Sequence, residues 1–116
     1  MVKKGPKNYI PDRGDLVWLE FNPQTGHEQA GKRPALIISP LAYNRVVGLA
    51  LLCPVTSKVK NYPFEVKLPE KSKIQGVILS DQVKSLDWQM RKVSFIEKVR
   101  KDILEEVIEK LLVLIK

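Results

Sequence analysis

The stretch GHEQAGKRPALIISP, residues 26–40, brings a carboxylate and a guanidinium to the start of a strongly apolar run. Glu28 can accept a hydrogen bond or a proton, and Arg33 is a planar fork of five donors that suits a phosphate. A hydroxyl, that of Thr56, follows a second apolar run at residues 48–55. These three groups together fit cleavage of a phosphodiester in RNA, where the nucleophile is the substrate's own 2′-OH.

The two apolar runs are expected to bring these groups together. Residues 34–39 and 48–55 have the length and bounding turn residues of strands, and a turn between them makes the pair antiparallel. The start of the first strand then lies beside the end of the second, so Arg33 faces Thr56 across one rung. The loop that carries Glu28 hangs over the same end. Convergence of three different polar groups at one sheet edge marks a candidate site.

Each of these residues also has a structural interpretation, which stays open. In the catalytic one, Arg33 neutralises the charge that develops on the phosphorane, and Glu28 takes the proton of the 2′-OH. A guanidinium is a poor proton donor, so we do not assign acid–base work to it. Alternatively, Arg33 pairs with Glu28 as a loop staple, and Thr56 is an ordinary strand-end hydroxyl.

Further polar and aromatic residues are candidate RNA contacts. Phe21 ends its strand as either a core residue or a platform for an unstacked base. Gln82 and Lys84 could read a base and hold a phosphate, or be the solvated end of a strand. The lysines near residue 59 form either a backbone clamp or a solvated loop. The full candidate set is Phe21, Gln29, Lys32, Ser57, Lys58, Lys60, Gln82 and Lys84.

Short apolar runs separated by turn residues predict a β-rich fold. The expected strands are 15–21, 34–39, 48–55, 63–68, 75–88 and 91–99. Such close spacing favours a small bent barrel or sandwich over βαβ units. Residues 101–116 instead carry apolar residues at helical spacing, with Asp102 as the expected cap and Glu105 completing a capping box. We therefore expect a mostly antiparallel β barrel closed by a C-terminal amphipathic helix.

The composition indicates a soluble, basic, single-domain protein. Twenty Lys and Arg against thirteen Asp and Glu give a net charge of +7, which favours a polyanionic partner or serves solubility alone. No apolar run reaches the roughly 18 residues of a membrane span, and the basic N-terminus lacks the apolar region of a signal peptide. We expect a cytoplasmic protein with a flexible tail at residues 1–8 and one domain at residues 9–116.

The single cysteine and the single histidine do not favour a metal site. Cys53 lies within an apolar run and is expected to be a small buried hydrophobe rather than a disulfide partner. One His and one Cys make no plausible zinc site, so no metal or other cofactor is expected. His27 alone cannot supply a two-histidine acid–base pair.

The chain has more apolar side chains than a small barrel can bury, which favours a dimer. A barrel this small has little interior, yet both faces of its strands are apolar, and Trp18, Trp88 and residues 111–115 all need cover. Burying part of that surface in an isologous contact between two copies is the simplest solution.

Taken in order, RGDLVWLEFNPQTGHEQAGKRPALIISP, CPVTS, YPFEVKL and GVILSDQVKSLDW resemble the MazF/PemK-type toxins, the mRNA interferases of toxin–antitoxin systems. The resemblance covers about residues 9–112. It implies a homodimer of SH3-like (MazF/CcdB-type) barrels that cleaves single-stranded RNA at short sequences without a metal. The products would carry a 2′,3′-cyclic phosphate and a 5′-hydroxyl. It also implies an antitoxin whose acidic, disordered segment occupies the RNA groove.

Carried over by position, the family's catalytic arginine falls on Arg33, its threonine on Thr56 and its loop glutamate on Glu28. Positions associated with RNA contact fall on Phe21, Lys60, Gln82 and Lys84. The stretches PLAYNRVVG and LPEKSKIQ are less characteristic of the family, which leaves the cleavage motif open.

Two rival functions use the same fold. One is a gyrase poison that traps a protein–DNA complex and cleaves nothing, and the other is an SH3-like RNA-binding module without activity. The gyrase poison has no need of an arginine–threonine pair, so EQAGKRP and PVTS together favour the nuclease over it. Charge and fold alone would equally allow the RNA-binding module.

Overall fold

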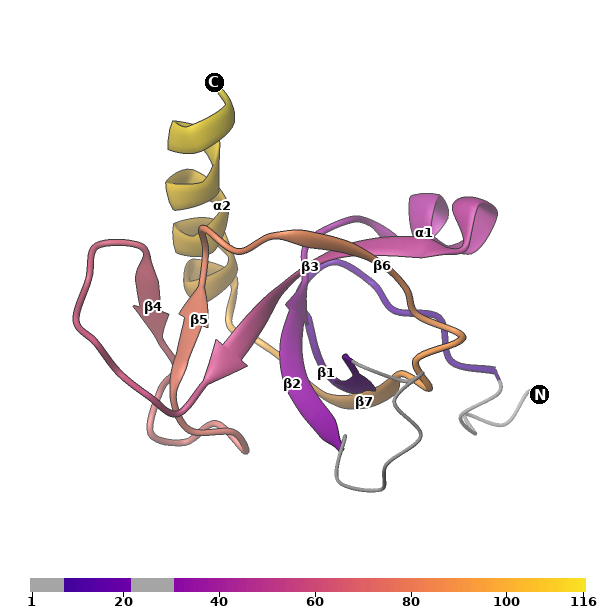
Figure 1. The fold of residues 1–116 in the computed structure, drawn as a ribbon, viewed down its shortest axis with the longest axis horizontal. Coiled ribbons are helices and arrows are strands. Elements are labelled where there is room, and N and C mark those ends of the chain that lie inside the picture. The colour runs from indigo at the N-terminus through magenta and orange to yellow at the C-terminus, as the bar shows by residue number, and fades with distance from the viewer. Residues whose placement is uncertain (1–7, 22–30) are drawn as a thin grey trace.

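The computed structural model describes residues 8–21 and 31–116. In chain order the elements are β1 (Asp15–Glu20), β2 (Lys32–Ile37), α1 (Leu41–Val47), β3 (Leu49–Thr56), β4 (Glu65–Lys67), β5 (Val77–Leu79), β6 (Lys84–Asp87), β7 (Ser94–Lys98) and α2 (Lys101–Ile115). The strands form one strongly curled sheet, with α2 standing beside β4 and β5 and α1 on the opposite side of the molecule (Figure 1).

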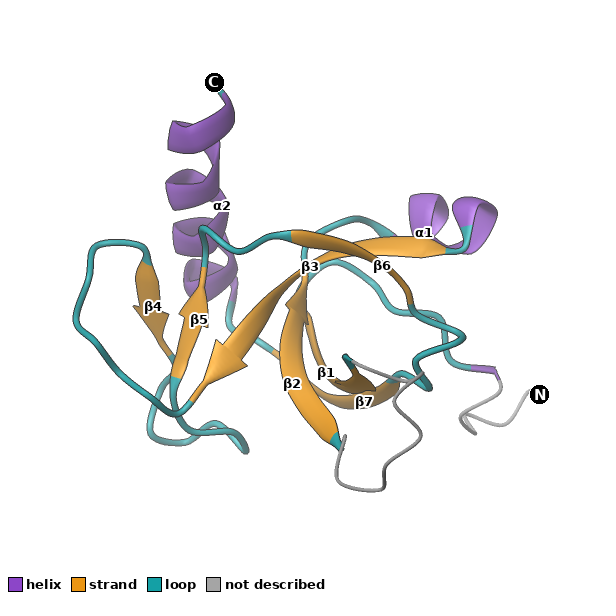
Figure 2. Ribbon diagram, in the orientation of Figure 1, coloured by secondary structure: helices purple, strands orange, loops and turns teal. Residues whose placement is uncertain are grey.

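The sheet is antiparallel throughout and follows the order β4-β5-β3-β2-β1-β7, while β6 pairs with β3 off this path. This confirms the predicted mainly β fold with a C-terminal helix. Within the described residues the sheet curls but does not close, because β4, β6 and β7 each pair with one strand only. The barrel is therefore partly open (Figure 2).

The long strand β3 organises the fold because two strands share one of its sides. Its first half pairs with β6, from Leu49 opposite Asp87, and its end pairs with β5, at Thr56 opposite Val77. The predicted strand 75–88 is therefore two strands. The N–H of Gln82 donates to the carbonyl of Leu79 at 3.1 Å, so the chain turns between them.

The sheet buries both of its faces, which explains why its central strands read as continuous apolar runs. On one face Leu16, Leu36 and Cys53 pack with the buried stripe of α2, which is Ile103, Val107 and Leu111. The side chains of Val17, Ala35 and Leu52 point to the other face and pack with Trp88 and Val93. Successive side chains of β1 therefore pack into two different hydrophobic cores, one on each face of the sheet.

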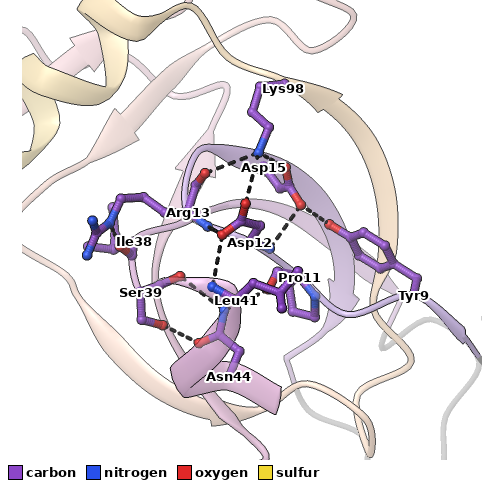
Figure 3. Close-up of polar contacts among 10 residues, drawn as sticks. All are labelled: Tyr9, Pro11, Asp12, Arg13, Asp15, Ile38, Ser39, Leu41, Asn44 and Lys98. Carbon is purple, nitrogen blue, oxygen red and sulfur yellow. Dashed lines mark hydrogen bonds and ion pairs between the residues drawn. The ribbon is translucent and has the colours of Figure 1, made fainter. Parts of the chain in front are cut away.

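Residues 40–47 were expected only to turn the chain, but they contain α1. Its first free N–H, on Leu41, donates to Oδ1 of Asp12 at 2.9 Å (Figure 3). The buried Asn44 side chain donates to the carbonyls of Pro11 and Ser39. Gly48 ends the helix in the left-handed conformation, at φ 83°. Partners distant in the sequence thus stabilise a seven-residue helix that its own sequence does not signal.

A polar network ties the N-terminal segment to the edge strand β7 (Figure 3). Lys98 Nζ lies 2.7 Å from Asp15 Oδ1 and 3.6 Å from Asp12 Oδ2, and the hydroxyl of Tyr9 donates to Asp15. Partial burial alone would raise the pKa of Asp12, but the N–H groups of Leu41 and Arg13 and the Lys98 ammonium together lower it. Burial, aided by Asp15, raises the pKa of Tyr9.

The helix α2 begins differently from the prediction. Arg100 occupies the N-cap position and no side chain caps the helix, so the predicted capping box at Asp102 and Glu105 is wrong. The Asp102 carboxylate instead accepts two hydrogen bonds from the Arg100 guanidinium, at 3.0 and 2.7 Å, and this partner lowers its pKa. An arginine directly before the helix is thus the main partner of the carboxylate that was expected to cap it.

In the parts of the chain that the structure describes, no helix combines the length and apolar character of a membrane span.

Candidate functional site

The strand pair β2 and β3 places Arg33 and Thr56 at the same end of the sheet. Their ladder runs Ala35 opposite Pro54, Leu36 opposite Cys53 and Ile37 opposite Leu52, which confirms the predicted antiparallel pairing. Continuing this register by two residues sets Arg33 opposite Thr56. The sheet geometry thus joins two polar residues that lie far apart in the sequence.

Both residues line a groove of about 730 Å³. Its wall is formed by Trp18, Phe21, Arg33, Pro34, Pro54, Val55, Thr56, Ser57, Lys58, Lys73, Ile74, Gln75, Leu79, Gln82 and Lys84. The mixture of aromatic, aliphatic, amide, hydroxyl and cationic groups matches the requirements of a single-stranded nucleic acid, which offers bases to stack and phosphates to neutralise.

The Thr56 hydroxyl has a defined orientation. Its Oγ1 accepts a hydrogen bond from the backbone N–H of Lys58 at 3.1 Å, as in a local hydroxyl turn. One lone pair is thereby used, and the hydroxyl hydrogen stays available to donate. A half-buried threonine held in this way can offer a hydrogen bond to a phosphate oxygen in the groove.

The Arg33 side chain is exposed, and among residues 8–21 and 31–116 it takes part in no ion pair. Its fork of donors is therefore available to an anion in the groove. Glu28 and Gln29 lie outside the described residues. The loop staple between Glu28 and Arg33, the role of Glu28 as the base and the RNA contact of Gln29 therefore stay predictions.

The structure divides the remaining candidates. Phe21, Ser57, Lys58, Gln82 and Lys84 all line the groove with Arg33 and Thr56. Lys32 and Lys60 do not. Lys32 stands opposite Glu20 in the ladder between β1 and β2. The backbone N–H of Lys60 donates to the Glu65 carboxylate at 2.9 Å, which orders the loop before β4.

The two tryptophans occupy different places from those expected. Trp88 is buried within the chain, where its Nε1–H donates to the carbonyl of Asn44 at 3.0 Å. The prediction that Trp88 needs cover from a second copy is therefore wrong. Trp18 and Phe21 both line the groove, which provides two aromatic side chains at one site.

Cysteine and metal chemistry find no support among the described residues. The Cys53 thiol is buried beneath α2, as predicted, and burial raises its pKa to about 12. Among the described residues there is no group of three or more His, Cys, Asp or Glu side chains that could hold a metal ion.

Residues 12–115 match the family model of the PemK-like, MazF-like toxin of type II toxin–antitoxin systems. The chain belongs to this family. Every strand and helix of the described residues, and the whole groove wall, falls within the match. The family resemblance predicted from the sequence is thus confirmed.

Individual members of the PemK-like, MazF-like family share much of the chain. The endoribonuclease toxin MazF of Escherichia coli K12 is 51% identical over 83 residues, which are 72% of this chain and 74% of that protein. The crystal structure of MazF from Deinococcus radiodurans is 53% identical, with a TM-score of 0.84 over 93% of this chain and 98% of that one. A MazE–MazF crystal structure from the same organism gives a TM-score of 0.85 at 47% identity, over 93% and 97% of the two chains.

Sequence reasoning missed one part of the toxin groove. Lys73, Ile74 and Gln75 line it from the loop between β4 and β5. No motif marks them, and only the pairing of β5 with the end of β3 brings them beside Thr56. The spacing of residues in the sequence does not indicate that contact. The sequence did show that the loop between the two expected strands carries charged and amide side chains.

Proposed function

We propose that this protein is a toxin that cleaves single-stranded RNA at specific sequences, without a metal, and leaves a 2′,3′-cyclic phosphate and a 5′-hydroxyl. The observation that carries the proposal is the presence of Arg33 and Thr56 in one basic groove with two aromatic side chains. The relatives in the family support it, since those from Escherichia coli are endoribonucleases by name.

In the proposed reaction the 2′-oxygen attacks the adjacent phosphorus, and the bond from phosphorus to the 5′-oxygen breaks. Arg33 neutralises the charge on the phosphorane oxygens, and stabilisation of developing charge commonly lowers the barrier more than any other single effect. Thr56 donates a hydrogen bond to one of these oxygens. Glu28 accepts the 2′-OH proton, and the leaving 5′-oxygen receives a proton in turn.

The groove residues around this pair would hold the RNA. Trp18 and Phe21 stack on unpaired bases, and the ammonium groups of Lys58 and Lys84 bind phosphates on either side. Gln82 carries a donor and an acceptor on one amide, which suits the edge of a base. We retain Gln29, Lys32 and Lys60 as outlying contacts, since RNA extends beyond the groove.

An acidic antitoxin is the proposed regulator. The chain carries a net charge of +7, and a MazE–MazF complex is among the similar structures. A disordered segment rich in Asp and Glu could lie in the same groove as RNA and block it. We place this toxin domain at residues 9–116, as a homodimer in the cytoplasm.

End mapping of a mixed-sequence RNA incubated with purified protein tests the function. We expect cuts at a defined motif, 5′-hydroxyl ends, full activity in EDTA, and no cut where the 2′-OH beside the scissile phosphate is replaced by hydrogen. Cleavage of the deoxy-substituted bond at the normal rate would contradict the mechanism. Binding without any cleavage would support the non-catalytic RNA module, and trapping of gyrase on DNA would support the gyrase poison.

A further inference from the structure

The loop between β4 and β5 is held in place at the edge of the groove. The hydroxyl of Ser72 donates to Oε2 of Glu97 on β7 at 2.6 Å, and the N–H of Lys73 donates to the same oxygen at 3.3 Å. The Ile74 side chain packs against the core beneath α2. Two hydrogen bonds to β7, at the other end of the sheet order, and one apolar anchor therefore hold the loop in place at the groove.

The end of this loop is pressed against the proposed catalytic strand. A Cβ atom on Gly76 would lie 2.3 Å from the carbonyl oxygen of Thr56, so the two backbones are in direct contact. The Cα of Gln75 is one peptide unit away, about 3.8 Å from that of Gly76. Gln75 thus lines the groove immediately beside Thr56.

Two hydrogen bonds orient the side-chain amide of Gln75. Its Nε2 donates to the carbonyl of Glu70 at 3.2 Å and to the carbonyl of Ser72 at 3.1 Å. Both partners are acceptors, so the nitrogen and not the oxygen must face them. The two N–H bonds of the amide are thereby used, while Oε1 has no donor among the described residues.

We propose that Gln75 is a specificity-determining residue that accepts a hydrogen bond, through Oε1, from an amino or imino N–H on the edge of an RNA base. This inference rests on the proposed function. A glutamine amide that is free to rotate by 180° can accept a hydrogen bond from one base or donate one to another. Rotation of the Gln75 amide would break its two hydrogen bonds to the carbonyls of Glu70 and Ser72. The site therefore rejects a base that presents an acceptor at this position. Lys73, two residues earlier, is placed to hold a neighbouring phosphate.

The test compares base preference rather than rate alone. The wild type, Gln75→Leu and Gln89→Leu are incubated with single-stranded RNA randomised over the cleavage site, and the ends are sequenced. Gln89 is an equally exposed glutamine in the turn between β6 and β7, outside the groove wall. We expect Gln75→Leu to lose preference at one position by roughly tenfold, and Gln89→Leu to keep the wild-type profile.

Base analogues then identify the donor. At the affected position, a base without its N–H donor should slow the wild type roughly tenfold and leave Gln75→Leu unchanged. Gln75→Glu keeps one acceptor but sets a second oxygen against the two carbonyls, so it should also lose the preference.

The outcomes separate the two proposals. If Gln75→Leu keeps the wild-type preference at every position, or slows all sequences equally, the residue is only a loop anchor and the inference is wrong. If the wild type itself cuts no RNA, the proposed function fails first, and the specificity role fails with it.

Discussion

The backbone of Gly76 lies against the carbonyl of Thr56, and no side chain fits between them. Gly76 has φ +130°, which disfavours every residue except glycine, and a Cβ there would be 2.3 Å from the Thr56 oxygen. This contact holds the backbone of Thr56, and with it the proposed catalytic hydroxyl, against the residue that leads into β5.

The first prediction concerns this contact. Gly76→Ala should destabilise the fold by about 2 kcal/mol, because the new methyl group must push β5 away from the end of β3. It should also lower kcat for RNA cleavage more than it raises KM, since Thr56 moves. Thermal denaturation and steady-state kinetics measure the two effects.

Gly48→Ala is the matched control. Gly48 also has a positive φ, at +83°, but a Cβ there meets nothing within 4 Å. It should lose stability through backbone strain while its turnover stays normal. Equal losses of turnover in both variants would mean that strain, and not the position of Thr56, determines the rate.

The second prediction concerns the guanidinium. Arg33→Lys should be nearly as harmful as Arg33→Ala, because a point charge cannot reproduce a bidentate fork on a phosphorane. We expect turnover to fall by about 10²–10³, by analogy with the loss of an oxyanion donor. Arg45→Ala, at an exposed cation of α1 outside the groove wall, should keep most activity. Near-normal turnover by Arg33→Lys would show that charge alone suffices.

The third prediction concerns acid stability. The pKa of Asp12 is lowered in the folded state, so its stabilising effect is complete above the unfolded value of about 3.9 and is lost as the pH falls through the folded value. Wild type should therefore lose more unfolding free energy than Asp12→Asn when the pH drops from 5 to below 3. Urea denaturation at each pH measures the difference, and parallel losses would contradict the role of Asp12.

Much of the fold was predictable because the apolar runs are long and strand-like. The pairing of residues 34–39 with 48–55 needed only strand length and a turn, and that pairing alone joined Arg33 to Thr56. The helix α1 was missed because Asp12, distant in the sequence, satisfies its first N–H. A local pattern cannot show a remote partner.

The groove was only partly predictable for the same reason. The stretch that ends at Gln75 stood out as uncharacteristic of the family, yet nothing in it indicated a contact with Thr56. The capping box failed because the Arg100 guanidinium competes for Asp102. Sequence reasoning thus found the residues whose chemistry is unusual and missed those whose importance comes from tertiary position.

The fourth prediction concerns the homodimer. Beyond the buried Leu111, the last turn of α2 exposes four consecutive apolar residues, Leu112, Val113, Leu114 and Ile115, at 41 to 73%. Sedimentation at micromolar concentration should give about twice the 13.3 kDa mass of the chain. A double change, Val113→Glu with Ile115→Glu, should give a monomer, since both charges would enter the contact.

Met90→Glu controls for the added charge on an exposed apolar residue, because Met90 is 66% exposed in the turn between β6 and β7. It should remain dimeric. A wild type that sediments as a clean monomer would contradict the proposed assembly, and an intact dimer in the double variant would place the contact elsewhere.

The fifth prediction is that RNA and an acidic antitoxin segment compete for the groove. Arg33, Lys58, Lys73 and Lys84 line it, and the chain charge of +7 becomes +14 in a dimer. If these four cations each contact a phosphate, a plot of the logarithm of RNA affinity against the logarithm of salt concentration should have a slope of about −3. The affinity of an acidic peptide should also fall as the salt concentration rises, because the same positive charges attract it.

Charge alone would not select one partner, so the peptide should also carry apolar residues that reach the surface formed by Trp18 and Phe21. Such a segment loses conformational entropy on binding but covers a long groove, which suits a reversible inhibitor. The measurement is displacement of a non-cleavable, 2′-deoxy RNA analogue by the peptide. Phe21→Ala should weaken both ligands, whereas Lys116→Ala, at the far end of α2, should weaken neither. Simultaneous binding of peptide and RNA without mutual loss of affinity would show that inhibition acts from a different surface.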